Sequence, residues 1–119
     1  MILSKTGSFY QWFIDWYKTI LSEVTIMISV PNEIQPYIQD DVIILDCLKG
    51  TTDSIDLSPF LKTLLQKADE HGLTIYLDPM PSGKDNNTRE FYVSLYQNHG
   101  FEFGSSQQFM SRNPITSKS

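Results

Sequence analysis

Few residues of this chain could take part in catalytic chemistry, since 119 residues include one cysteine and two histidines. Asp46 and Cys47 stand together in the apolar run VIILDCL (42–48). The Asp46 carboxylate could accept a proton from an ammonium group through water, or it could simply face solvent, because it alternates with Leu45 and Cys47. Cys47 has no partner nearby in the sequence, so we interpret it as a small buried hydrophobe rather than a nucleophile.

His71 and His99 each precede a glycine that is expected to end a helix, where an imidazole complements the negative helix end. The spacing of His and Cys does not suit a zinc site, so no metal is predicted. A single cysteine excludes an internal disulfide and favours a reducing compartment.

The excess of acidic over basic residues argues against nucleic acid as a partner. There are 14 acidic and 9 basic residues, a net charge of -5, and no cluster of Lys or Arg that would bind a phosphate backbone. The apolar stretches are interrupted by charge, Gly or Pro, and the first residues lack a signal-peptide pattern. The sequence therefore predicts a cytoplasmic protein that binds neither nucleic acid nor membrane.

The elements that must position these residues alternate between helices and strands, which indicates a single α/β domain over 1–119 with helices on the faces of a mixed sheet. Ser8, Ser58 and Pro59 mark helix starts, and Gly72 and Gly100 mark helix ends. We expect the tail after Pro114 to fray. Helices are predicted at 8–22, 58–71 and about 88–99, and strands at 24–30, 33–39, 42–48, 73–77, about 101–104 and 107–112, the last two as a hairpin.

The first helix carries a broad aromatic face. Phe9, Trp12, Phe13 and Trp16 recur at spacings of three and four, which places them together on an amphipathic helix. Such a face serves either core packing or contact with another chain. We expect it to support association, as a homodimer or with a protein partner.

The second half of the chain resembles the carboxyl-terminal half of GNAT-family N-acetyltransferases, over about residues 42–114. The residues that carry the resemblance are FLKTLLQKADEHGLTIYLDP, FYVSLYQNHGFEF and the closing strand QFMSRNP. LDPMP followed by a polar loop is also similar to short acetyltransferase-like proteins of bacteriophages. The resemblance implies a mixed, mostly antiparallel central sheet flanked by helices, here with a shortened amino-terminal part.

This resemblance implies a function and a set of site residues. An acetyl group would pass from acetyl-CoA to an amine, on a small molecule or a protein lysine, in the cleft where strands VIILDCL and LTIYL splay apart. Tyr96 lies at the position of the general acid that protonates the departing thiolate, or it packs on the sheet; Asp46 would be the base. The implied contacts to coenzyme A fall at Leu45, Cys47, Leu57, Ser58, Asn86 and Asn87, although the two asparagines could also simply cap the helix.

Two departures from the family pattern leave a second function open. The segment GTTDSIDLS stands where the family has a basic residue and paired glycines that bind a pyrophosphate. Asp53 and Asp56 would repel this ligand by about 1 kcal/mol per close pair. The alternative is a catalytically inactive protein of this fold that acts as an interaction module.

Overall fold

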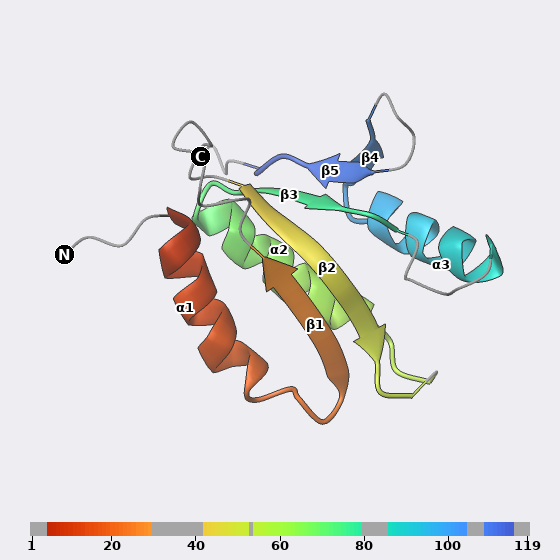
Figure 1. The fold of residues 1–119 in the computed structure, drawn as a ribbon, viewed down its shortest axis with the longest axis horizontal. Helices are drawn as coiled ribbons and strands as arrows, with labels where there is room; N and C mark the ends of the chain where they lie inside the picture. The colour runs from red at the N-terminus through yellow and green to blue at the C-terminus, as the bar shows by residue number, and fades with distance from the viewer. Residues whose placement is uncertain (1–4, 30–41, 53, 80–85, 105–108, 116–119) are drawn as a thin grey trace.

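The computed structural model describes residues 5–29, 42–52, 54–79, 86–104 and 109–115, which form one mixed sheet with helices (Figure 1). Three of the four strand pairings are antiparallel, and only β2 and β3 run parallel. The strand order is β1-β2-β3-β5-β4. This confirms the predicted α/β class and mixed sheet. The elements are α1 (Lys5–Tyr17), β1 (Val24–Ser29), β2 (Val42–Gly50), α2 (Ser58–Glu70), β3 (Thr74–Leu77), α3 (Asn86–Gln97), β4 (Glu102–Phe103) and β5 (Met110–Arg112).

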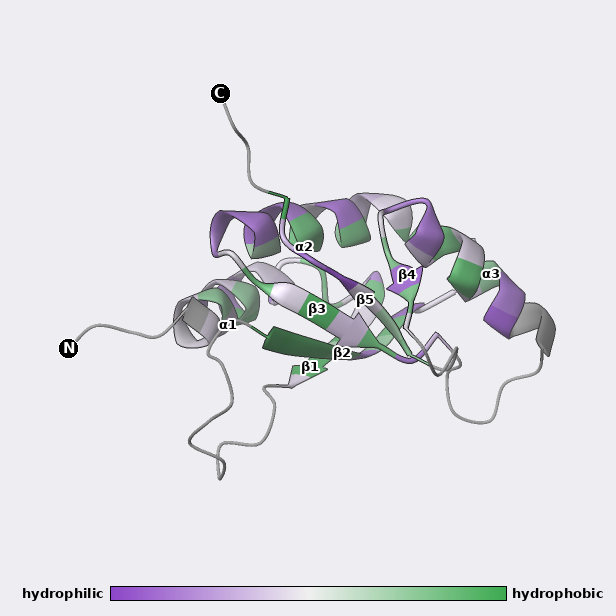
Figure 2. Ribbon diagram, turned by 90° about the horizontal axis from the view of Figure 1, so that it is seen from above, coloured by the Kyte–Doolittle hydropathy of each residue, from purple (hydrophilic) through white to green (hydrophobic). Residues whose placement is uncertain are grey.

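One face of the sheet is buried beneath the helices. Helices α1 and α2 lie on the same side of the sheet, and α3 lies at the opposite end from α1, near β4 (Figures 1 and 2). Because side chains alternate along a strand, every second strand residue enters the core that these helices cover. The buried strand residues are Val24, Ile26, Ile43, Leu45, Leu48, Ile75, Leu77, Met110 and Arg112.

Helix α1 supplies part of this core. Phe9 and Phe13 are buried, and Trp12 and Trp16 are partly buried, so most of the aromatic face is core packing. The Tyr17 hydroxyl accepts a hydrogen bond from the backbone N–H of Ile26 at 3.1 Å, which ties the end of α1 to β1.

The boundaries of α1 differ from the prediction of 8–22. The helix begins at Lys5 and ends at Tyr17, and residues 18–23 form turns. Ser8 therefore lies inside the helix rather than at its N-cap. The apolar residues Ile20 and Leu21 continue the spacing of the stripe without continuing the helix, because tertiary packing decides where a helix ends.

The other helices end where glycine allows the backbone to reverse. Gly72 and Gly100 have φ of 68° and 95°, a region that other residues adopt at a cost. Helix α2 starts at Ser58 as predicted, but its N-cap is Leu57 and no side chain caps it from that position. Pro59 falls within the first turn, where its missing N–H costs nothing.

The last predicted elements also have counterparts. β4 and β5 pair antiparallel, with Phe103 opposite Met110, which confirms the hairpin with shorter strands. Ile115, predicted to fray, donates its backbone N–H to Asp69 at 2.9 Å. The predicted strand at 33–39 lies outside the described residues. No helix in the described ranges combines the length and apolar character needed to cross a membrane.

Candidate functional site

The candidate site begins at an unpaired stretch of β2. The parallel pairing with β3 runs from Val42 opposite Thr74 to Leu45 opposite Leu77, where β3 ends. β2 continues to Gly50, and no strand of the described residues pairs with it on the β3 side beyond Leu45. We call residues 46–50 the free end of β2. The backbone N–H and C=O groups on its β3 side can pair with an extended ligand, as an added strand would, while β1 pairs with the other side.

A β-bulge marks the start of this free end. On the β1 side, Met27 lies opposite Cys47 and Ile28 lies opposite Leu45, so Asp46 has no partner in the register. A bulge bends the strand and changes the direction of the neighbouring side chains. Asp46 is exposed, and Cys47 is partly buried rather than fully enclosed as predicted.

Two tyrosines of α3 lie near Cys47. The rings of Tyr92 and Tyr96 are stacked with centroids 6.0 Å apart, and Tyr96 also makes an edge contact with Phe101 at 5.4 Å. Burial raises the pKa of the Tyr96 phenol well above its ordinary value of 10.0, and the nearby Tyr92 and Cys47 raise it further. The pKa of Tyr92 is raised by burial and by Cys47. Both phenols therefore keep their protons at neutral pH.

The Tyr96 hydroxyl is buried, and no residue that the structure describes forms a hydrogen bond with it. Tyr96 is 4% exposed, and no hydrogen bond joins its hydroxyl to another residue in the part of the chain that the structure describes. An unsatisfied buried hydroxyl costs about 1–3 kcal/mol, so such a group calls for an explanation. A reacting group that accepts its proton would satisfy it.

An open hollow of about 620 Å³ lies beside α3, between this helix and the segment that leads into α2. Its lining combines apolar side chains with two carboxylates, from Asp56 and Glu90. Asp56 also accepts a hydrogen bond from the backbone N–H of Ser58 at 3.0 Å. The lining residues are Ser54, Ile55, Asp56, Leu57, Ser58, Glu90, Phe91, Ser94, Leu95 and Asn98.

The structure brings together only part of the residues expected at the site. Leu45 and Leu57 are 3% and 5% exposed and point into the core, so they can contact a ligand only through their backbone. Leu57 and Ser58 do border the hollow. Asn86 and Asn87 begin α3, and the side chains of both, like the whole of Asp53, lie outside the described residues.

Phe91 and Glu90 were missed as site residues. Phe91 is 56% exposed and borders the hollow, whereas its neighbour Tyr92 is buried. The apolar spacing of FYVSLY contains no signal that separates Phe91 from Tyr92, since adjacent helix residues lie only 100° apart. The acidic character of this region could be inferred from the sequence only at Asp53 and Asp56.

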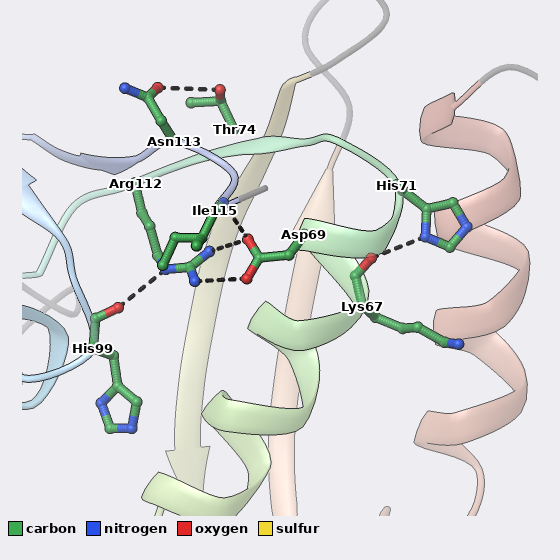
Figure 3. A network of polar contacts seen from close by, with 8 residues as sticks. All are labelled: Lys67, Asp69, His71, Thr74, His99, Arg112, Asn113 and Ile115. Atoms are coloured by element: carbon green, nitrogen blue, oxygen red, sulfur yellow. Dashed lines mark hydrogen bonds and ion pairs between the residues drawn. The ribbon is translucent and has the colours of Figure 1, made fainter. Parts of the chain in front are cut away.

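A second cluster of polar contacts joins α2 to β5 and stabilises the fold (Figure 3). Arg112 is 6% exposed and forms two hydrogen bonds to Asp69, at 2.8 and 2.9 Å, while its Nε donates to the His99 carbonyl at 3.1 Å. We call Asp69, His99, Arg112 and Ile115 the Arg112 network. Burial opposes ionisation of Asp69, but the hydrogen bonds from Arg112 and Ile115 and the Arg112 charge outweigh it and lower the pKa of Asp69.

The histidines contact helix ends, as their positions suggest. Nδ1 of His71 lies 2.9 Å from the Lys67 carbonyl, and Nδ1 of His99 lies 2.9 Å from the Leu95 carbonyl, so each ring donates to its own last helical turn. Within the described residues, no three His, Cys, Asp or Glu side chains gather in a way that could hold a metal ion.

Comparisons of the chain with protein-family models, with curated proteins and with solved structures gave no match.

Proposed function

We propose that this protein is a shortened acetyltransferase of the GNAT type, which moves an acetyl group from a coenzyme A thioester to an amine in the cytoplasm. One observation carries the proposal: Cys47, in the free end of β2, lies near Tyr96, whose buried hydroxyl has no hydrogen-bond partner among the described residues. The mixed sheet and the early end of the β2–β3 pairing support it.

The reaction uses few groups of the protein. A backbone N–H at the free end of β2 polarises the thioester carbonyl, and the amine attacks its carbon. A C–N bond forms, the C–S bond breaks, and the departing thiolate takes the proton of Tyr96. The phenolate regains a proton that the amine releases, and exposed Asp46 assists this transfer through water.

The Tyr96 phenol suits the role of acid because it is protonated at neutral pH. Its raised pKa makes it a weak acid, so the transfer requires the thiolate to form within hydrogen-bonding distance of the hydroxyl. Tyr96→Phe removes this proton and leaves the ring contacts with Tyr92 and Phe101.

The test is release of free thiol from acetyl-CoA in the presence of a panel of primary amines. We expect turnover with at least one amine and a loss of about 100-fold or more in Tyr96→Phe. Tyr92→Phe is the matched control, because it removes a hydroxyl from the same aromatic stack, and it should keep most of the activity. Equal rates for the parent and Tyr96→Phe would remove Tyr96 from the mechanism.

A second candidate function is that of an inactive interaction module, and the uncovered face of the sheet favours it. Met27 and Tyr76 point away from the helices and are 57% and 44% exposed, while Phe109 beside β5 is 49% exposed. If this candidate holds, millimolar acetyl-CoA leaves the unfolding temperature unchanged. Binding at 100 times the dissociation constant would instead stabilise the protein by about 2.7 kcal/mol.

A further inference from the structure

The start of α2 has little capacity to bind a phosphate. A helix N-terminus binds anions through its first backbone N–H groups, which have no partner inside the helix. Here the Ser58 N–H already donates to Asp56, and Pro59 has no N–H. The Leu61 N–H donates to the Leu57 carbonyl at 3.0 Å, as part of the helix itself. The chain thus occupies its own anion-binding position with a carboxylate.

The hollow beside this helix start also disfavours an anion. Asp56 and Glu90 border it, and its lining within the described residues contains no Lys, Arg or His. The remaining surface comes from apolar side chains, such as Ile55 and Phe91, and from uncharged polar ones. The three phosphates of coenzyme A would enter a region of like charge with few donors to receive them.

The free end of β2 has the opposite character. Its backbone groups are neutral donors and acceptors along an extended strand, and Cys47, next to the bulge, lies near Tyr96. The pantetheine arm is an uncharged, extended chain with two amide groups. Such a chain can pair with a strand in the same way that a peptide does.

We propose that this protein recognises its acyl donor through the acyl-pantetheine arm alone, and that the phosphates of coenzyme A add no favourable binding energy. This inference rests on the proposed function, because it specifies the donor of that same site. In this respect the chain would differ from proteins whose glycine loop binds the pyrophosphate, a loop that its sequence lacks.

The test compares acetyl-CoA with acetyl-pantetheine, which lacks every phosphate, by calorimetric titration of the full chain. We expect the dissociation constant of acetyl-pantetheine to be equal to or lower than that of acetyl-CoA, to within about threefold. We also expect the affinity for acetyl-CoA to rise with added salt, because salt screens the repulsion. Acetyl-CoA binding about tenfold or more tightly than acetyl-pantetheine overturns the inference and leaves the proposed function standing. Failure of both thioesters to bind overturns the two together.

Asp56→Asn refines the comparison, since the Asn side chain can still accept the Ser58 N–H while the charge is removed. We expect this variant to bind acetyl-CoA up to about fivefold more tightly and acetyl-pantetheine with unchanged affinity. Glu70→Gln is the matched control, because it removes a negative charge at the other end of α2, and neither affinity should change. A loss of acetyl-CoA affinity in Asp56→Asn would contradict the inference.

Discussion

Ionisation of the Tyr96 hydroxyl should make the stability of the protein depend on pH. The pKa of Tyr96 is raised in the folded protein, so the folded state holds its proton more firmly than the unfolded chain does. The stabilisation is complete below the ordinary pKa of 10.0 and is lost as the pH rises above it. We therefore expect the free energy of unfolding, measured by urea titration, to fall as the pH rises above 10.0.

Tyr96→Phe provides the control for this prediction. The variant has no phenol to ionise at that position, so the slope of unfolding free energy against pH above pH 10.0 should become shallower. Tyr92 contributes a second, smaller part of the slope, because its pKa is raised as well. An identical slope in the parent and in Tyr96→Phe would show that Tyr96 is not buried as described.

The ion pair between Asp69 and Arg112 is the other residue-scale feature with a large expected effect. Asp69→Asn leaves the buried Arg112 guanidinium without its carboxylate, and we expect the free energy of unfolding to fall by about 3 kcal/mol or more. Chemical denaturation at pH 7 measures this loss. Because the pKa of Asp69 is lowered on folding, its contribution is present above the ordinary value of 3.8 and is lost as the pH falls below it.

A surface ion pair on the same helix is the comparison for Asp69→Asn. Lys67 and Glu70 are 2.9 Å apart, but Glu70 is 61% exposed, so Glu70→Gln should change stability by no more than about 0.5 kcal/mol. Equal effects of the two substitutions would contradict the structural role of the Arg112 network.

Sequence reasoning located single residues unevenly. Tyr96 could be singled out because a motif surrounds it, and its burial follows from the helical spacing it shares with Tyr92. Arg112 belongs to the quoted strand QFMSRNP, but its partner Asp69 is 43 residues away, and nothing in the local sequence connects them. The hydrogen bond from the Ser58 N–H to Asp56 could not be predicted either, because the sequence offers Ser58 itself as a residue that could cap α2.

At the scale of elements, the question is whether the aromatic face of α1 packs in the core or contacts another chain. Phe9 and Phe13 lie in the core, so they are not available to a second chain, whereas Trp12 stacks on Trp16 at 5.0 Å near the surface. We expect Phe9→Ala to lower the free energy of unfolding by about 3–5 kcal/mol. Urea denaturation measures this, with Tyr10→Ala, at a residue 41% exposed, as the control that should cost much less.

A different result for Phe9 would support the association prediction. If Phe9→Ala changed the apparent mass in light scattering and left the stability of the monomer unchanged, the aromatic face would be a contact surface. The homodimer stays a prediction until such a measurement is made.

The helices and strands themselves were largely predictable, but the bulge was not. Glycines and apolar spacing fix α2, α3 and the strands at their approximate positions, because these signals act within a few residues. The bulge at Asp46 arises from the register between β1 and β2, whose pairing spans the segment between Ser29 and Val42. VIILDCL contains no Gly or Pro that would mark an irregular position.

At the scale of the whole molecule, the sheet presents two unlike faces. Helices cover one face, and the other exposes Met27 and Tyr76 within the described residues. The strand order, with β5 between β3 and β4, could not be derived from periodicity, because it depends on contacts between distant segments. The expected mixed sheet came from the order of elements and from the resemblance.

The central claim is that a thioester binds along the free end of β2 beside Tyr96, and amide NMR on the full chain tests it most directly. Titration of ¹⁵N-labelled protein with acetyl-CoA and with acetyl-pantetheine should shift the amide signals of residues 46–50, Leu77 and Tyr96 most strongly. Signals of Tyr10 and Gln11, exposed residues of α1, serve as the internal control and should move little. Unchanged spectra at saturating thioester, or shifts confined to α1, would contradict the account.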